Sequence, residues 1–130
     1  MKDITYCADV IAKLADKFVV IRRLSALPGL AFPGGHREKD EYLSDTAYRE
    51  FEEETGLELI ITGTLCTKAE PGRDPRGNYV TTVFFGEARG IPKNEAGQTE
   101  VILMSREEII ARSNEFILDH FAMFKEYIEL

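Results

Sequence analysis

An acidic helix that lies between two glycine turns is the feature that most constrains this chain. Residues 37–54 carry eight acids and three bases, so about a third of the protein's 23 carboxylates lie in this short segment. Within a helix predicted over 44–55, Glu50, Glu53 and Glu54 stand at i, i+3 and i+4. This spacing places the three carboxylates on one face of the helix.

The other side of the same helix is apolar. Ala47 and Phe51 recur there and are expected to pack on a sheet. Ser44 is the predicted N-cap, and Asp45 lies in the first turn, where the helix dipole favours an anion. Gly56 is the predicted stop signal at the C-terminus. The local signals therefore agree on a helix with one buried face and one acidic face.

Like charges at this spacing destabilise an isolated helix by about a few tenths of a kcal/mol per pair. The penalty rises if the face is partly buried, unless cations neutralise it. Hard divalent cations such as Mg²⁺, which prefer oxygen ligands, would do so. The alternative is a solvated acidic surface on which Arg49 pairs with a neighbour. On the helix alone, that alternative is favoured.

Length and charge exclude several classes of protein. The chain has 130 residues, which fits a single domain over 1–130. Its net charge of −7 argues against nucleic-acid binding through a basic face. Apolar stretches are far shorter than the roughly 20 residues that a membrane span needs, and the N-terminus does not resemble a signal peptide. Cys7 and Cys66 are interpreted as reduced thiols in a cytoplasmic protein, with a single disulfide as the alternative.

Strands mixed with helices favour a layered α/β or α+β domain. The predicted strands lie at residues 4–12, 17–24, 57–67, 79–87 and 101–104, and the first two form a hairpin. Pro33-Gly34-Gly35 predicts a turn ahead of the acidic helix. Two further helices are predicted at 105–112 and 115–128, and the second has an apolar stripe of Phe116, Ile117, His120, Phe121, Phe124, Tyr127 and Ile128.

The wider spacing around the acidic helix resembles the Nudix box of the Nudix hydrolases, G-x5-E-x7-R-E-U-x-E-E-x-G-U, where U is apolar. Phe51 stands where the family usually has Ile, Leu or Val, and every other specified position is matched. The matching residues are Gly35, Glu41, Arg49, Glu50, Phe51, Glu53, Glu54, Gly56 and Leu57. The resemblance implies the family's α/β/α sandwich with a mixed β-sheet.

The resemblance also implies roles for the residues of the box. Glu50, Glu53 and Glu54 would hold catalytic Mg²⁺, for which Mn²⁺ can substitute, together with the backbone carbonyl of Gly34. Arg49 would orient the carboxylates through charge-assisted hydrogen bonds. Glu53, Glu54 and Arg49 are therefore expected to be catalytic residues. The implied reaction is substitution at phosphorus by water.

The loop at 70–78 bears on the substrate. Arg73 and Arg76 place two cations near the metal face, and Arg forks match phosphate geometry. The alternative is a surface loop in which these arginines pair with Asp74 or Glu70. Arg-Asp-Pro-Arg-Gly in this loop, with Pro71 about fifteen residues past the box, resembles the ADP-ribose pyrophosphatase branch. That resemblance implies hydrolysis of ADP-ribose to AMP and ribose 5-phosphate.

Two further pairs of residues leave a choice open. Relatives often place a catalytic glutamate in the loop before the last strand, and Glu95 is the first candidate for the base, with Glu100 second. Arg22 and Arg23 end the second strand, so one should face the cleft while the other faces solvent. A phosphate contact by the first and a surface ion pair are equally open. His120 lies in the apolar stripe and is expected to be a core histidine.

Two other functions are weighed against ADP-ribose hydrolysis. One is a nucleotide-sanitising nucleoside triphosphate pyrophosphohydrolase. The other is a non-catalytic module that senses a nucleotide, but such modules usually lose carboxylates of the box. The expected partner is a small-molecule nucleotide, with neither nucleic acid nor membrane, and a homodimer is the default assembly.

Overall fold

The computed structural model describes residues 3–130. Seven strands form one sheet: β1 (Thr5–Leu14), β2 (Lys17–Arg23), β3 (Gly29–Ala31), β4 (Gly34–His36), β5 (Glu58–Lys68), β6 (Tyr79–Arg89) and β7 (Thr99–Met104). The helical elements are α1 (Leu43–Thr55), α2 (Arg106–Ala111), the 3₁₀ turn η1 (Ser113–Glu115) and α3 (His120–Ile128).

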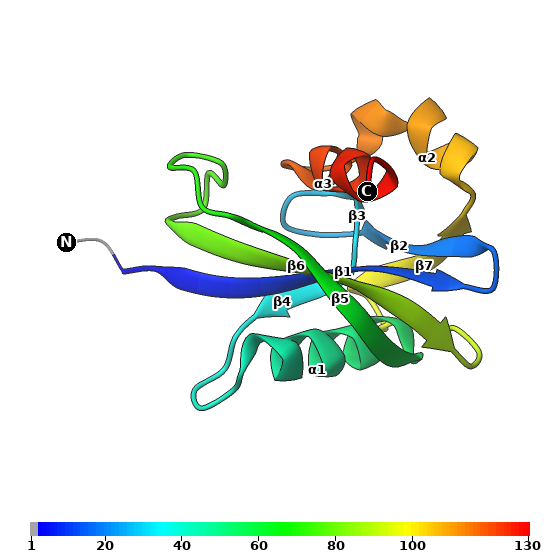
Figure 1. The fold of residues 1–130 in the computed structure, drawn as a ribbon, viewed down its shortest axis with the longest axis horizontal. Coiled ribbons are helices and arrows are strands. Elements are labelled where there is room, and N and C mark those ends of the chain that lie inside the picture. Colours follow the sequence, from blue (N-terminus) through cyan, green and yellow to red (C-terminus); the bar gives the residue numbers. More distant parts are fainter. Residues whose placement is uncertain (1–2) are drawn as a thin grey trace.

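The sheet is mixed, with strand order β3-β2-β1-β6-β5. β1 and β6 run parallel along their whole length, while the other pairs are antiparallel. β4 pairs with β1, and β7 pairs with β2. Figure 1 shows α1 on one side of the sheet and α2 and α3 on the other. The predicted α/β/α sandwich is therefore confirmed.

Two cores lie on the two sides of the sheet, because strand neighbours point to opposite faces. In β1, Val10 contributes to the core under α1, and Ile11 to the core under α3. The core under α1 is completed by Ala47 and Phe51, both fully buried, which confirms their expected packing on the sheet. The core under α3 is rich in aromatic rings, with Phe18 and Phe124 meeting edge to face at 5.0 Å.

The predicted strands and the N-terminal hairpin are confirmed, with Lys13 paired to Phe18 at the turn. The predicted glycine turn at 33–35 is only partly right. Pro33 lies in a bend, but Gly34 and Gly35 already pair with Asp9 and Ala8 of β1. The glycines are thus part of the sheet rather than outside it.

The prediction that Ser44 caps the acidic helix is wrong. The N-cap is Tyr42, whose backbone N–H donates to the Asp45 carboxylate at 3.0 Å. The hydroxyl of Thr46 also donates to the Tyr42 carbonyl. Because Asp45 and Thr46 satisfy the backbone at Tyr42, the helix begins at Leu43, and Ser44 lies in its first turn.

The helix predicted over 115–128 is also wrong in its first half. α3 starts only at His120, and Leu118 has a positive φ of 50°. The preceding segment pairs with β3 instead: the Ile117 N–H donates to the Leu30 carbonyl at 2.9 Å, and Phe116 bridges to the same residue. Phe116 is nevertheless buried in the core under α3. Its apolar character therefore predicted its burial correctly, although the predicted helix there is absent.

Cys7 is buried, Cys66 is half-buried, and both are free thiols. Across residues 3–130, no helix has the length and apolar character needed to cross a membrane.

Candidate active site

The site forms where α1 packs against β4. A Cβ on Gly34 would collide with the side chain of Asp9 and the Ala8 carbonyl, and a Cβ on Gly35 would collide with the Glu50 carboxylate. Only glycine at these two positions allows β4 to lie between β1 and the acidic face of α1. The double glycine therefore determines how closely the carboxylates approach the sheet.

The three glutamates of this face differ in burial. The Glu53 side chain is 50% exposed, that of Glu50 is 19% exposed, and Glu54 is buried. Glu54 follows the buried Phe51 by three residues, so the helix turns both toward the sheet. Its carboxylate accepts a hydrogen bond from the Gly34 N–H at 2.8 Å.

Burial raises the pKa of Glu54 to about 8, although the hydrogen bond from Gly34 opposes this. The charges of Glu50, Asp9 and Glu95 raise it further. Burial also raises the pKa of Glu50, which the adjacent Arg49 counteracts. Burial therefore disfavours the charged form of these carboxylates, and a cation bound beside them would favour it.

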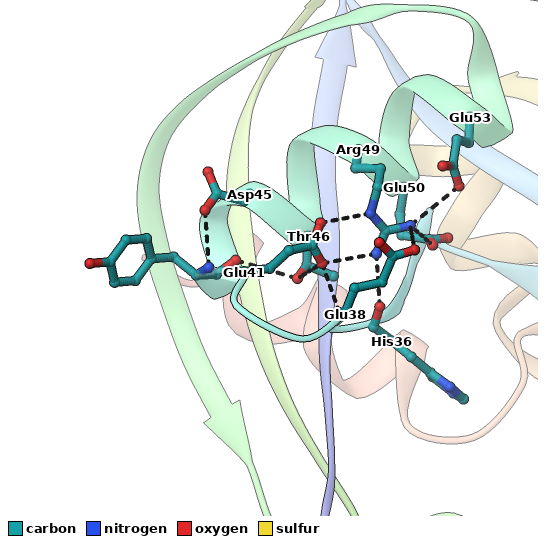
Figure 2. A network of polar contacts seen from close by, with 9 residues as sticks. His36, Glu38, Glu41, Asp45, Thr46, Arg49, Glu50 and Glu53 are labelled. Atoms are coloured by element: carbon teal, nitrogen blue, oxygen red, sulfur yellow. Dashed lines mark hydrogen bonds and ion pairs between the residues drawn. The ribbon is translucent and has the colours of Figure 1, made fainter.

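Arg49 organises the rest of the acidic face (Figure 2). Its guanidinium donates to both oxygens of Glu41, at 2.7 and 3.0 Å, and to Glu50 at 2.6 Å. It also reaches the His36 carbonyl at 2.9 Å and Glu53 at 3.4 Å. The bond from Arg49 lowers the pKa of Glu41 to about 2. Arg49 thus ties the loop before α1, and β4, to the helix.

The chemistry of these donors fits a hard divalent cation. Glu50, Glu53 and Glu54 supply carboxylate oxygens, and the Gly34 peptide lies beside Glu54; Mg²⁺ prefers such oxygen ligands. Within the described part of the chain, no three acidic, histidine or cysteine side chains already surround one point. Glu50 and Glu53 are held by Arg49 instead, so they must turn to ligate an ion.

The ladder between β2 and β7 separates Arg22 from Arg23. Arg23 pairs with Thr99, and Arg22 with Glu100, so the two pairs lie on opposite faces of the sheet. Arg23 lines a cavity of about 140 Å³ together with Glu54. Two of its N–H groups donate to the Ala26 carbonyl at 3.0 and 3.1 Å. Arg23 is therefore the arginine that faces the acidic site.

The same cavity contains Glu95. Its charge raises the pKa of both Glu50 and Glu54, which places it close to the acidic face of α1. Glu100, the second candidate for the base, is exposed on the opposite face of the ladder. The structure thus brings Glu95, and not Glu100, to the carboxylates of the helix.

Arg73 and Arg76 line a second cavity of about 70 Å³, which Arg23 and Gly34 also border. Arg73 is almost fully buried and bonds both oxygens of Asp119, at 2.7 and 2.8 Å. Arg76 bonds the Asp74 carboxylate at 2.8 and 3.1 Å, which is the pairing weighed as the alternative. Both arginines are near the site, but much of their hydrogen-bonding capacity is used within the protein.

Two buried polar residues, Asp9 and His120, also line this second cavity, and Asp9 was not identified from the sequence. Asp9 is buried, which raises its pKa to about 7, and its carboxylate lies 3.5 Å from Nε2 of His120. His120 accepts the Phe32 N–H through Nδ1, and burial lowers its pKa to about 4. His120 is thus the expected core histidine. The signal for Asp9 was an acid within an otherwise apolar strand, Cys7-Ala8-Asp9-Val10.

The three-layer fold, with an acidic helix held behind a double glycine, defines an α/β/α sandwich built around a Nudix box. A family model described as the NUDIX domain matches residues 5–125. The chain belongs to the NUDIX domain family.

Curated and solved proteins are consistent with this assignment. The ADP-ribose pyrophosphatase of Methanocaldococcus jannaschii is 38% identical over 60 residues, which are 46% of this chain and 36% of that protein. The match therefore spans only about a third of the relative's length.

Solved structures share the fold at lower identity. The NUDIX domain of Shewanella oneidensis NrtR, complexed with ADP ribose, is similar with a TM-score of 0.86 and 21% identity, over 99% of this chain and 89% of that chain. A bifunctional NMN adenylyltransferase/ADP ribose pyrophosphatase from Francisella tularensis, complexed with AMP and Mn ion, has a TM-score of 0.85 and 22% identity, over 99% of this chain and 42% of that chain.

Replacing Arg73 by Ala should destabilise the fold strongly. The change leaves the Asp119 carboxylate, 24% exposed, without its bidentate partner, and breaking such a pair costs about 3–5 kcal/mol. Denaturant unfolding measures the loss. Arg112→Ala, which breaks the exposed pair with Glu115, is the control and should change stability little. Equal stability of Arg73→Ala and wild type would contradict the structural role.

Without divalent ions, Glu54 should make stability depend on pH. Its pKa of about 8 in the folded state exceeds the ordinary 4.5, so the folded protein binds this proton more tightly than the unfolded chain. Its contribution to the unfolding free energy is therefore fully present below about pH 4.5 and is lost as the pH rises toward 8.

Glu54→Gln keeps an acceptor for the Gly34 N–H and removes this dependence, so its stability relative to wild type should increase over that range. Adding Mg²⁺ should raise the unfolding free energy of the wild-type protein more than that of Glu54→Gln. Thermal unfolding of both proteins across pH 4–9 measures the effect. Parallel stability curves for the two proteins would show that Glu54 is not the group responsible.

Proposed function

We propose that this protein is a Mg²⁺-dependent hydrolase that cuts a nucleoside diphosphate linked to another group, with ADP-ribose as the preferred substrate. The products are then AMP and ribose 5-phosphate. The observation that carries the proposal is the buried carboxylate of Glu54, which accepts the Gly34 N–H beside the double glycine and lines a cavity together with Glu95. An ordinary solvated acidic helix would leave its carboxylates in water, whereas Glu54 is buried.

The residues can be given chemical roles. Glu50, Glu53 and Glu54 would hold the cation, for which Mn²⁺ can substitute. When bound, such a cation polarises phosphoryl oxygens and lowers the pKa of a coordinated water. Glu95 would accept the proton of the attacking water as its oxygen bonds to phosphorus. The bond from phosphorus to the bridging oxygen breaks, and the leaving phosphate keeps that oxygen.

Positive groups complement the carboxylates across the site. Arg23 has five N–H donors, and two of them reach the Ala26 carbonyl. Its remaining donors are suited to a diphosphate oxygen. Arg76 retains a 35% exposed side chain at the neighbouring cavity and can reach the same anion. The substrate is thus expected to lie between α1 and the ends of β2 and β6.

ADP-ribose is favoured because two relatives are described with it in their names. The 60-residue match is to an ADP-ribose pyrophosphatase, and the NUDIX domain of NrtR was crystallised with ADP ribose. The Arg-Asp-Pro-Arg-Gly loop agrees with that branch. The second candidate function, a nucleotide-sensing module without catalysis, fits the loop equally well. The complete set of box carboxylates favours the enzyme.

Purified protein with Mg²⁺ should release AMP and ribose 5-phosphate from ADP-ribose faster than it cuts NADH, diadenosine polyphosphates, GDP-mannose or dNTPs. Chromatography of the products identifies the bond that breaks. Glu53→Gln and Glu54→Gln should each lose at least about 100-fold in kcat while the folds survive, because charge stabilisation at the metal is lost.

A monophosphate and pyrophosphate released preferentially from a dNTP would favour the sanitising alternative. Binding of ADP-ribose with no turnover would favour the sensing module. Unchanged kcat in both glutamine variants would contradict the metal assignment.

Arg23→Ala should weaken substrate binding more than Arg22→Ala does. Arg23 faces the acidic site, whereas Arg22 lies on the other face of the same ladder. We expect KM for ADP-ribose to rise at least about 10-fold in Arg23→Ala, as for the loss of one charge-assisted contact to phosphate. Steady-state kinetics on the two adjacent variants provide a matched comparison. Equal KM values would exclude Arg23 as the phosphate contact.

A further inference from the structure

Thr99 carries a buried hydroxyl that forms no hydrogen bond with the described residues. The residue opens β7 and is only 6% exposed. Among residues 3–130, its Oγ1 is the one buried side-chain polar atom that lacks a hydrogen-bond partner. An unsatisfied buried hydroxyl destabilises a protein, whereas an apolar group of the same shape would not. Such an atom therefore needs an explanation.

The residues around Thr99 explain why its hydroxyl has no partner within the core. Thr99 lines the 140 Å³ cavity that also contains Arg23, Glu54 and Glu95. It pairs with Arg23 in the ladder between β2 and β7, so it lies on the face of the sheet that is turned toward α1. The orphan hydroxyl thus belongs to the acidic site rather than to the packed core.

Glu95 lies directly opposite Thr99 in the fold. The two residues form an isolated antiparallel bridge, and the Thr99 N–H donates to the Glu95 carbonyl at 3.2 Å. Directly opposed residues of such a bridge project to the same side, with Cβ atoms about 4.5–5.5 Å apart. A rotation of the Glu95 side chain alone therefore brings its carboxylate to the Thr99 hydroxyl.

Two other charged groups of the cavity are poorer partners than Glu95. Arginine has no acceptor, which excludes Arg23. One oxygen of Glu54 already accepts the Gly34 N–H. In the part of the chain described by the structure, the Glu95 carboxylate accepts no side-chain or backbone hydrogen bond, so both members of the new pair are available.

We propose that Thr99 is a positioning residue: its hydroxyl donates to the Glu95 carboxylate and holds it toward Glu54 in the 140 Å³ cavity. This inference rests on the proposed function, in which Glu95 accepts the proton of the attacking water. The hydrogen bond orients the carboxylate but does not contact the substrate. Thr99 should therefore affect kcat rather than KM.

The test uses the full chain and the isosteric change Thr99→Val, which replaces only the hydroxyl by a methyl group. We expect kcat for ADP-ribose to fall about 10-fold with KM unchanged, and Thr99→Ser to recover most of the loss. Thr99→Val should remain folded, because the methyl group fills the space of the hydroxyl, and thermal unfolding checks this. Thr64→Val, the same change at an exposed position of β5, is the control and should leave kcat unchanged.

A double-mutant cycle with Glu95→Gln tests whether Thr99 acts through Glu95. In the Glu95→Gln background, Thr99→Val should cause no further loss of kcat. A full additional 10-fold loss would show that Thr99 acts elsewhere and would overturn the inference. Wild-type kcat in Thr99→Val would overturn it as well. A wild-type protein that cuts no nucleotide contradicts the proposed function, whereas an active wild type with an unaffected Thr99→Val contradicts the inference alone.

Discussion

The burial of the Glu54 carboxylate is the constraint on which the rest of the site depends. The helical period that turns Phe51 into the core under α1 also turns position 54 toward the sheet. An apolar residue at 54 would satisfy the packing, but a carboxylate there loses hydration and, among residues 3–130, receives only the Gly34 N–H in return. A cation bound beside Glu54 would remove that cost, so the packing of the helix and the proposed metal site are two aspects of one arrangement.

Arg49 divides the remaining carboxylates into two groups. Glu41 is held by a bidentate bond and serves the loop before α1, because its pKa is far too low for it to exchange protons near neutral pH. Glu50 and Glu53 both contact Nη1 of the same guanidinium, Glu53 at the longer distance of 3.4 Å, whereas Glu41 is bound by Nε and Nη2. The arginine can therefore keep its hold on Glu41 and the His36 carbonyl while these two side chains turn toward an ion. In the proposed enzyme, Arg49 secures the frame, and a cation bound from solution would complete the site.

The sequence could predict what is local or periodic. The acidic face, the apolar stripe of Ala47 and Phe51, the hairpin and the strands each follow from residues close together in the chain. The N-cap was missed because Asp45 and Thr46 together hold the backbone at Tyr42. The last helix was predicted to begin too early because Ile117 pairs with Leu30, far away in the sequence. Likewise, nothing near Arg73 reveals that Asp119 occupies its guanidinium, and a threonine at the start of a strand carries no sign that its hydroxyl will lack a partner.

The difference between local patterns and contacts of distant residues also explains why the Nudix box does not identify the substrate. The carboxylates proposed to hold the ion come from one continuous helix, where spacing alone determines their relative positions. The opposite wall comes from the ends of β2 and β7, where the register of the ladder decides that Arg23 and Thr99 face α1 while Arg22 and Glu100 face away. A shift of one residue in that register would exchange the two pairs without altering any residue of the box. The side chains opposite the box are thus placed by tertiary pairing, and their positions become visible only when the sheet is built.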